Sequence, residues 1–492
     1  MMDWNKLLCA ERKRGSSMPI RYDKGSTEAR SEFERDYDRV IFSNPVKRLQ
    51  DKTQVFPLDP NDAVRTRLTH SLEVSSVARG LAIAVGKWLL EKGHINKDDD
   101  RRSIEAIAAT CGIIHDLGNP PFGHSGEESI RHWFRTRLVE TKKINSLGLS
   151  KQQCNDFLYF EGNAQTLRLL TKLQILADKN GLNLTYGTLS ASCKYLARSD
   201  EIKKVIHDRK KPGYFYSEDE IVKEIRKKTG TGKARHPITF LVESADDIVY
   251  SIADIEDAIK KGIMKWNFVV SVIDGVLDVK DETFSKEQKV ILQKRLNDCF
   301  NKMVRILIPE ERTNTDCINW YNNDFRVKVS NHSDDVLASA FRTSYISIMV
   351  PLIVETFIEK YNEIMSGSYH KELVSDCEAS TLLGLLKRIG VKYVYNTPSN
   401  LKLELMGKEV ICDLMDIFWE GIEHYDRKKE KHTCDNHFAK KIMDLVSKNY
   451  LTVFCDSVNE PENYCRFQLL TDYICGMTDG FAKRLHAELK NG

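Results

Sequence analysis

Apolar residues recur every three or four positions through long stretches of the chain, and this periodicity is the strongest constraint on its fold. The interval is the one that lines side chains along one face of an α-helix. One such stripe comprises Leu72, Val74, Val77, Ala78, Leu81, Val85, Trp88 and Leu89. Another comprises Leu241, Ala245, Ile248, Ile252, Ile255 and Ile259, and residues 285–308, 335–365 and 436–455 follow the same pattern. The sequence therefore predicts an all-α fold, a large helical bundle.

One segment of the C-terminal part has the alternation of a β-hairpin instead. Residues 391–395 and 401–405 each alternate apolar and polar side chains, and the turn-prone residues 396–400 separate them. Short alternating runs on either side of a turn are typical of paired strands. We therefore expect a small hairpin near 391–405 on an otherwise helical body.

Composition excludes several classes of protein. The chain has 492 residues, of which 41% are hydrophobic and 29% charged, as is ordinary for a globular protein. Its net charge is only +3, so any phosphate or nucleic-acid site has to be a local basic patch. The 12 cysteines form no CxxC pair, which disfavours a zinc ribbon or a secreted disulfide scaffold.

No signal-peptide core or linker is evident. The N-terminus lacks an apolar segment, and no run approaches the ~18 apolar residues of a membrane span. We therefore expect a cytoplasmic protein with reduced thiols and no membrane association. Since nothing marks a clean boundary, residues 1–492 are expected to form a single large, mostly helical unit.

His115 and Asp116 are adjacent metal-binding residue types at the end of an apolar run. His115 continues the stripe of Ile104, Ala108 and Cys111, so it is expected to point toward the core. An Asp at a helix C-terminus opposes the helix dipole, which makes it a poor structural choice unless a cation lies nearby. A buried structural His followed by a surface Asp is the alternative interpretation.

Two further residues complete a candidate ligand set. His70 begins the first long helix, and Asp246 lies on the helix expected over 241–259. Together with His115 and Asp116 they would form a mixed nitrogen and oxygen site that suits Mn²⁺, Mg²⁺, Fe or Zn²⁺. Tyr250 and Asp254 follow Asp246 on the same helical face; a solvated acidic face is the competing explanation.

The order His70, His115-Asp116, Asp246 is the signature of the HD superfamily of metal-dependent phosphohydrolases. Longer segments resemble the bacterial deoxyguanosinetriphosphate triphosphohydrolases: Arg65–Val74, His115–Glu127, Phe160–Gln165 and Glu243–Tyr250. The resemblance runs over nearly the whole chain. It implies an HD core at residues 65–260 and a helical C-terminal part at residues 261–492, which includes the expected hairpin.

This resemblance implies a reaction and a set of residue roles. The family converts dGTP and water into deoxyguanosine and inorganic tripolyphosphate, here with Mn²⁺ or Mg²⁺ as the most expected cofactor. The implied metal ligands are His70, His115, Asp116 and Asp246, and the implied catalytic pair is His124 and Glu127. The implied substrate-binding residues are Gln54, Arg67, Asn163, Lys194, Lys211 (or its neighbour Lys210), Tyr250, Asp254, Tyr395 and Glu404.

General chemistry agrees with these roles. An Arg such as Arg67 can clamp two phosphate oxygens, and lysines neutralise the remaining charge. The 5′-oxygen of the sugar is a poor leaving group that needs a proton, and His124 is its natural donor, although a role in activating water is also open. Tyr250 packed against C2′ would disfavour ribose, and Glu404 could accept both N1–H and N2–H of guanine.

Other functions remain open at this point. A triphosphohydrolase of the same fold could act on all dNTPs, and an HD phosphodiesterase or 5′-nucleotidase could act on monophosphates. A protein of a different class could bind single-stranded DNA and use its HD centre for regulation. The resemblance also implies a homo-oligomer, expected to be a hexamer, with single-stranded DNA as a candidate effector.

Overall fold

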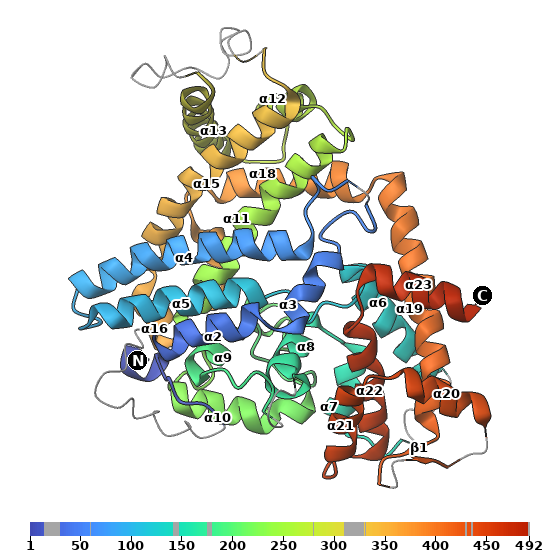
Figure 1. Ribbon diagram of the computed structural model, residues 1–492. Coiled ribbons are helices and arrows are strands. Elements are labelled where there is room, and N and C mark those ends of the chain that lie inside the picture. Colours follow the sequence, from blue (N-terminus) through green and yellow to red (C-terminus); the bar gives the residue numbers. More distant parts are fainter. Residues whose placement is uncertain are drawn as a thin grey trace.

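The computed structural model describes residues 1–13, 30–59, 61–140, 147–174, 180–278, 280–308, 329, 331–428, 431–433 and 436–490. Within these ranges nearly all of the regular secondary structure is helical, which confirms the all-α prediction (Figure 1). The sheet in the described part is one antiparallel pair, β1 (Tyr425–Asp426) with β2 (Lys431–His432).

The first half of the chain forms the helices that carry most of the predicted site. In chain order they are α1 (Trp4–Leu7), α2 (Glu32–Ile41), α3 (Asn44–Arg48), η1 (Leu49–Asp51), α4 (Arg67–Glu91), α5 (Asp98–Ile114), α6 (Gly123–Phe134), η2 (Arg135–Glu140), α7 (Lys151–Leu158), α8 (Gly162–Arg168), η4 (Leu169–Leu173), α9 (Tyr186–Ala191), η5 (His207–Arg209), η6 (Tyr216–Glu218), α10 (Asp219–Thr229) and α11 (Pro237–Lys260).

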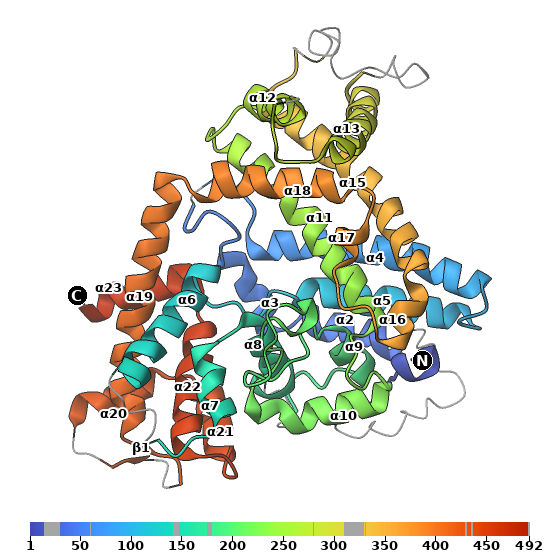
Figure 2. The ribbon, with the colours of Figure 1, turned by 180° about the vertical axis from the view of Figure 1, so that it is seen from behind.

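The second half adds a further set of helices around them (Figure 2). They are α12 (Trp266–Leu277), α13 (Lys286–Leu307), α15 (Asp334–Glu359), α16 (Tyr361–Ser366), α17 (Leu373–Asp376), α18 (Ser380–Ile389), η8 (Gly390–Tyr395), α19 (Pro398–Glu423), α20 (His437–Leu445), α21 (Lys448–Asp456), α22 (Glu462–Cys475) and α23 (Asp479–Lys490).

Helices α4, α5 and α11 hold the centre of the fold. Helices α4 and α5 lie side by side in both views, and α11 packs against both of them (Figures 1 and 2). Thr66 caps the start of α4, because its side chain accepts from the Thr69 N–H and Thr69 in turn accepts from the Thr66 N–H. The stripe predicted for α11 is buried, and so are Val74, Ala78, Leu81, Val85 and Leu89 of the α4 stripe. Leu72 of that stripe is exposed instead, and Val77 and Trp88 are half-buried.

Two hydrophobic cores are present. One joins α4, α5 and α11 to α12, α13, α15 and α18. The other joins α6–α10 to α19, α21, α22 and α23. Residues from elements of both cores line the main cavity of the molecule, so the cavity lies where the two cores meet.

The prediction of a β-hairpin at residues 391–405 is wrong. Residues Gly390–Tyr395 form the π-helical turn η8, and α19 begins at Pro398. Five-residue alternation also fits a helix, because Leu401 and Leu405 are four positions apart and share a face. Pro398 occupies the first turn of α19, where its missing N–H costs nothing. Of the turn predicted at 396–400, only Asn396 and Thr397 lie between the two helices, because α19 already includes residues 398–400.

Helix α15 is the one described segment long and apolar enough to cross a membrane by length and composition. The sequence pattern did not single it out as such. Half of its most apolar window is buried inside the molecule, where Phe341, Tyr345 and Met349 are fully buried. Core helices of globular proteins have this composition, and α15 packs against α11 and α13 as such a helix does.

Candidate active site and metal centre

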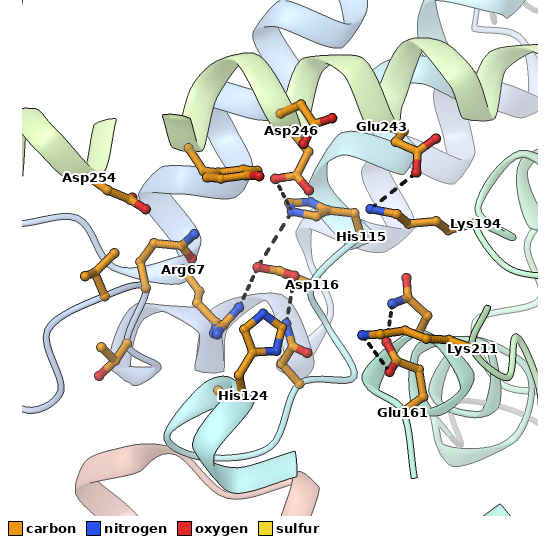
Figure 3. A pocket seen from close by; sticks show the side chains of 18 of the residues that line it. Arg67, His115, Asp116, His124, Glu161, Lys194, Lys211, Glu243, Asp246 and Asp254 are labelled. Atoms are coloured by element: carbon orange, nitrogen blue, oxygen red, sulfur yellow. Dashed lines mark hydrogen bonds and ion pairs between the residues drawn. The ribbon is translucent and has the colours of Figure 1, made fainter. Parts of the chain in front are cut away.

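A cavity of about 690 Å³ contains nearly all of the predicted site residues. Its walls come from α4, the turn after α5, α6, α11, η8 and α19, and Figure 3 shows the side chains converging on it. Of the predicted residues, all line the cavity directly except His70 and Glu127, each of which contacts a lining residue. Segments separated by more than 300 residues therefore share one site.

Three of the predicted metal ligands form a tight cluster. His70 Nε2 lies 3.2 Å from Asp246 Oδ1, and His115 Nε2 lies 3.5 Å from the same oxygen. Each residue comes from a different element: α4, the end of α5, and α11. All three donor atoms lie within 4.8 Å of one another.

These residues fit a divalent cation. The His115 Nδ1–H donates to the Gly112 carbonyl at 2.8 Å, which leaves Nε2 facing Asp246. That Nε2 is buried and has no hydrogen-bond partner among the described residues. Two imidazoles with a carboxylate are a donor set used by Mn²⁺, Fe and Zn²⁺, and an unpaired buried nitrogen is what such a site presents to an ion.

Asp116, the fourth predicted ligand, lies beside the cluster. Its Oδ2 is 3.6 Å from His115 Nε2 and accepts from Arg67 Nη1 at 2.5 Å, while its Oδ1 accepts from Asn119 Nδ2 at 2.7 Å. Burial raises the pKa of Asp116, but His115 and Arg67 outweigh burial and bring the pKa to about 2. The carboxylate is therefore ionised at neutral pH, and its role as a ligand remains a prediction.

His124 and Glu127 form a pair at the start of α6. His124 Nδ1 lies 3.2 Å from Glu127 Oε2, and the hydrogen bond raises the pKa of His124 above its ordinary value. The side chain of His124 is 87% exposed, whereas that of Glu127 is only 2% exposed. Glu127 is fixed from behind because its Oε1 accepts the Gly162 N–H at 2.7 Å. The imidazole thus reaches into the open cavity from a rigid support.

Two predicted phosphate-side lysines are held by buried carboxylates. Lys194 Nζ lies 3.6 Å from Glu243 Oε1, and Lys211 Nζ lies 2.9 Å from Glu161 Oε2. Asn163 Nδ2 donates to the other oxygen of Glu161 at 2.9 Å. Burial lowers the pKa of Lys194, but Glu243 outweighs it and raises the pKa well above the ordinary value. The cations are therefore fixed in direction before any anion binds.

Sequence reasoning gave no role to Glu161, Glu243 or Lys387. Glu243 lies one helical turn before Asp246 on α11. Because the two residues share a helical face, the sequence spacing could have predicted that Glu243 lies at the site. Lys387, on α18, contacts Asp247 Oδ1 at 2.7 Å and lies 5.0 Å from the centre of the Tyr250 ring. No local signal identifies Lys387, because its partners are about 140 positions earlier in the chain.

A second group of metal-capable side chains adjoins the cavity. His207, Glu243 and Glu372 also bring donor atoms within 4.8 Å of one another. Arg235 already donates to Glu243 at 2.7 Å, and Lys210 Nζ lies 3.0 Å from His207 Nδ1. Because these cations neutralise the carboxylates, the group is better described as an ion-pair network than as a metal site.

The remaining predicted residues occupy the opposite side of the cavity. Gln54, Tyr250 and Asp254 line it near η8, and Gln54 Oε1 and Asp254 Oδ1 are buried with no hydrogen-bond partner in the described structure. The Tyr395 hydroxyl donates to Asp254 Oδ2. Glu404 lines the cavity from α19, and its backbone carbonyl accepts from Ser125 Oγ at 3.1 Å.

Comparison with known families first identifies the class of protein. Residues 67–153 match the HD domain. This segment carries His70, His115 and Asp116, and it also includes the His124–Glu127 pair. The helical fold and the clustered imidazoles and carboxylate are those of an HD-domain protein.

Relatives over the full chain identify the family. The deoxyguanosinetriphosphate triphosphohydrolase-like proteins of Listeria monocytogenes and Listeria innocua are each 37% identical over 99% of both chains. The deoxyguanosinetriphosphate triphosphohydrolase of Salmonella enteritidis is 31% identical over 92% of both chains. The chain belongs to the deoxyguanosinetriphosphate triphosphohydrolase family, and it is a hydrolase that acts on a deoxynucleoside triphosphate.

Proposed function

We propose that this protein hydrolyses dGTP to deoxyguanosine and inorganic tripolyphosphate, by attack of water at the α-phosphorus. One observation carries the proposal: a cluster of metal donors, a set of fixed cations and an exposed imidazole share a single 690 Å³ cavity. The names of the relatives support dGTP as the substrate.

The metal centre would be held by His70, His115 and Asp246, with Asp116 as the fourth ligand. When bound there, a divalent cation withdraws charge from a phosphate and makes its phosphorus more electrophilic. Mn²⁺ and Mg²⁺ are the ions we propose first, and Fe or Zn²⁺ suit the same donor set.

The phosphate side of the pocket neutralises a highly charged substrate. Arg67, Lys194 and Lys211 each engage a carboxylate in the structure, so the phosphate oxygens would join these pairs or replace the carboxylates. Arg67 can engage two oxygens with its planar fork, and Asn163 adds an amide donor. A monophosphate would leave most of these cations unused, which argues for a triphosphate.

The geometry of His124 supports a role in moving the proton that the reaction needs. With Nδ1–H donated to Glu127, Nε2 is the atom available to a bound molecule. The raised pKa of His124 increases its protonated fraction near neutral pH. We propose that it protonates the 5′-oxygen as the bond to the α-phosphorus breaks. The opposite assignment, in which the pair deprotonates water, predicts a different pH profile, given below.

The other side of the pocket would hold the nucleoside. We propose that Tyr250 packs against C2′ and excludes a ribose hydroxyl, and that Asp254 and Gln54 bind the 3′-hydroxyl. Glu404 and Tyr395 are the residues proposed to face the guanine. Glu404 lines the same cavity, which supports this role. Its carboxylate matches the two N–H donors that guanine presents.

Product analysis tests the proposed function directly. The protein is incubated with each dNTP and Mn²⁺, and tripolyphosphate is detected by ³¹P NMR. We expect release of tripolyphosphate with dGTP preferred, and a loss of about 10²–10⁴-fold in His124→Gln. His132→Gln, the same change at an exposed position of α6, should leave turnover intact.

Other outcomes of this assay would favour the alternatives. Equal turnover of all four dNTPs would establish a broad triphosphohydrolase and contradict dGTP specificity. Salt-dependent binding of single-stranded DNA with no nucleotide turnover would contradict the proposal and favour a DNA-binding regulatory protein.

We further propose that the protein works in the cytoplasm as a homo-oligomer, a hexamer by analogy with the family, with single-stranded DNA as an effector. These properties rest on the family resemblance. Light scattering coupled to size exclusion measures the oligomer, and turnover with added single-stranded DNA measures the effector. A monomer whose turnover is insensitive to DNA would contradict both.

A further inference from the structure

We infer that Tyr395 is a positioning residue that orients the carboxylate of Asp254, so that its second oxygen is presented to a hydroxyl of the bound sugar. This inference rests on the proposed function, because it concerns the nucleoside side of the same pocket. It assigns Tyr395 a role in reading the sugar, through Asp254, whether or not its ring also touches the base.

The first observation is the contact itself. Tyr395 ends η8, and its hydroxyl donates to Asp254 Oδ2 on α11. The donor and acceptor are 141 positions apart in the chain, so the bond joins two separate elements. Both residues line the cavity. Of the two oxygens of the carboxylate, Oδ2 is therefore already used within the protein.

The second observation is how firmly Tyr395 is held. Its backbone carbonyl accepts from Asn400 Nδ2 at 3.3 Å, and Asn400 is buried near the start of α19. Its ring lies against Gly390, where an added Cβ would be 3.6 Å from the hydroxyl oxygen. Single π-helical turns such as η8 often occur at functional sites, because they redirect side chains. The hydroxyl thus has a defined direction.

The third observation concerns the other oxygen. Asp254 Oδ1 is buried and has no hydrogen-bond partner among the described residues, and neither has Gln54 Oε1 in the same wall. A buried acceptor without a donor is unfavourable, so a ligand O–H group that donates to one of these oxygens would be favoured here. In a 5′-triphosphate of deoxyribose the free hydroxyl is at C3′. The chemistry therefore selects that group.

A Tyr395→Phe variant isolates the hydroxyl. The phenyl ring keeps the packing against Gly390 and any stacking on a base, and only the hydrogen bond to Asp254 is lost. The matched control is Tyr393→Phe, the same change two residues earlier in η8. The Tyr393 ring packs against Phe268, with 5.0 Å between the ring centroids. Tyr393 does not line the cavity.

The experiment compares dGTP with 2′,3′-dideoxyGTP, which lacks the 3′-hydroxyl. Turnover and equilibrium binding are measured for the wild type, Tyr395→Phe, Tyr393→Phe and Asp254→Asn. We expect Tyr395→Phe to lower kcat/KM for dGTP by about tenfold, as loss of a hydrogen bond to a carboxylate implies. The value for the dideoxy compound should change little, and Tyr393→Phe should match the wild type on both.

The double variant provides an independent check. If Tyr395 acts through Asp254, Tyr395→Phe has no further effect on the preference for dGTP in the Asp254→Asn background. Equal losses on both nucleotides, or independent effects that multiply in the double variant, would overturn the inference.

Binding separates this inference from the proposed function. Suppose that the wild type releases no tripolyphosphate but binds dGTP better than the dideoxy compound, and that Tyr395→Phe loses this preference. That result would contradict the proposed reaction and support the role of Tyr395. A wild type that binds both nucleotides equally would overturn the inference whatever its turnover.

Discussion

Several side chains of the pocket are each paired with a buried group that fixes their direction. Glu127 directs His124, Glu243 directs Lys194, and the Gly112 carbonyl directs His115. Fixed donors and acceptors lose little conformational freedom when a ligand binds, so such pairs reduce the entropic cost of binding. Substitution of a partner residue therefore tests the role of the side chain whose direction it fixes.

The pair of His124 and Glu127 makes a prediction about pH. A general acid has to be protonated, so activity falls as pH rises through the pKa of His124. Glu127 raises that pKa. In Glu127→Gln the pKa of His124 falls, and the alkaline limb of the kcat profile should move to lower pH. The profile is measured in buffers of constant ionic strength.

The control for this profile is Glu128→Gln, because Glu128 is exposed and contacts Arg131 and Arg135 rather than His124. Its profile should match the wild type. A shift of the acidic limb of the kcat profile in Glu127→Gln would show that His124 works as a base. If neither limb shifts, His124 takes no part in proton transfer.

At the scale of elements, α19 supports the turn that carries His124. Phe122 precedes α6 with a left-handed backbone, φ 60°, which is unfavourable for a residue with a side chain. The ring of Phe122 packs against Gly407 of α19, where an added Cβ would lie 2.8 Å from the ring. Asp479 at the start of α23 accepts the Phe122 N–H at 3.0 Å and the Thr53 N–H at 3.0 Å. C-terminal helices thus hold the turn that precedes His124.

This support predicts the effect of Gly407→Ala. A helix-interior Gly→Ala change normally stabilises by about 0.5–1 kcal/mol, because alanine has the higher helix propensity. At Gly407 the new methyl group would push the Phe122 ring, so we expect lower kcat and no gain in stability. Gly384 of α18 has open space around it, and Gly384→Ala should gain that stability with full activity. Thermal melting and turnover measure both variants, and full activity in Gly407→Ala would contradict the proposed support.

Comparison of sequence and structure shows which parts could be predicted. The stripes of α4, α5 and α11 extend over several turns, so their helices and the inward direction of His115 follow from periodicity alone. The segment 391–405 is too short for its alternation to exclude a helix, and the hairpin was wrong for that reason. The partners Glu161 and Lys387 were missed because their contacts depend on the tertiary arrangement.

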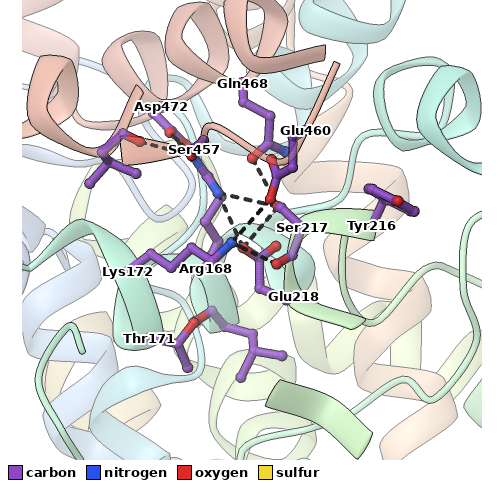
Figure 4. A network of polar contacts seen from close by, with 12 residues as sticks. Arg168, Thr171, Lys172, Tyr216, Ser217, Glu218, Ser457, Glu460, Gln468 and Asp472 are labelled. Carbon is purple, nitrogen blue, oxygen red and sulfur yellow. Dashed lines mark hydrogen bonds and ion pairs between the residues drawn. The ribbon is translucent and has the colours of Figure 1, made fainter. Parts of the chain in front are cut away.

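Across the whole molecule, a buried polar network joins the N-terminal and C-terminal halves (Figure 4). Arg168 of α8 donates to both oxygens of Asp472 on α22, at 2.6–3.0 Å, and to Glu218 of η6 at 3.1 Å. Gln165 also donates to Asp472, at 2.9 Å. Asn163, proposed to bind phosphate, lies on the same helix as Arg168. Loss of the network should therefore lower the free energy of unfolding strongly and disturb the position of Asn163 to a smaller extent.

The network predicts a large loss of stability for Arg168→Met. Removing one partner of a buried ion pair leaves uncompensated charge and costs about 3–5 kcal/mol. Arg135→Met is the matched control, because Arg135 pairs with Glu128 at the surface and its loss should cost about 0–1 kcal/mol. Urea unfolding measures both. Equal stability of the two variants would contradict the structural role of the network.

We propose that His70, His115 and Asp246 together bind one divalent cation on which hydrolysis depends. Mn²⁺ binding followed by electron paramagnetic resonance, with tripolyphosphate release measured on the same samples, tests it most directly. We expect a tight Mn²⁺ site in the wild type, and loss of both the site and the activity in Asp246→Asn. Tight Mn²⁺ binding that survives in Asp246→Asn, or full activity in the presence of a chelator, would contradict it.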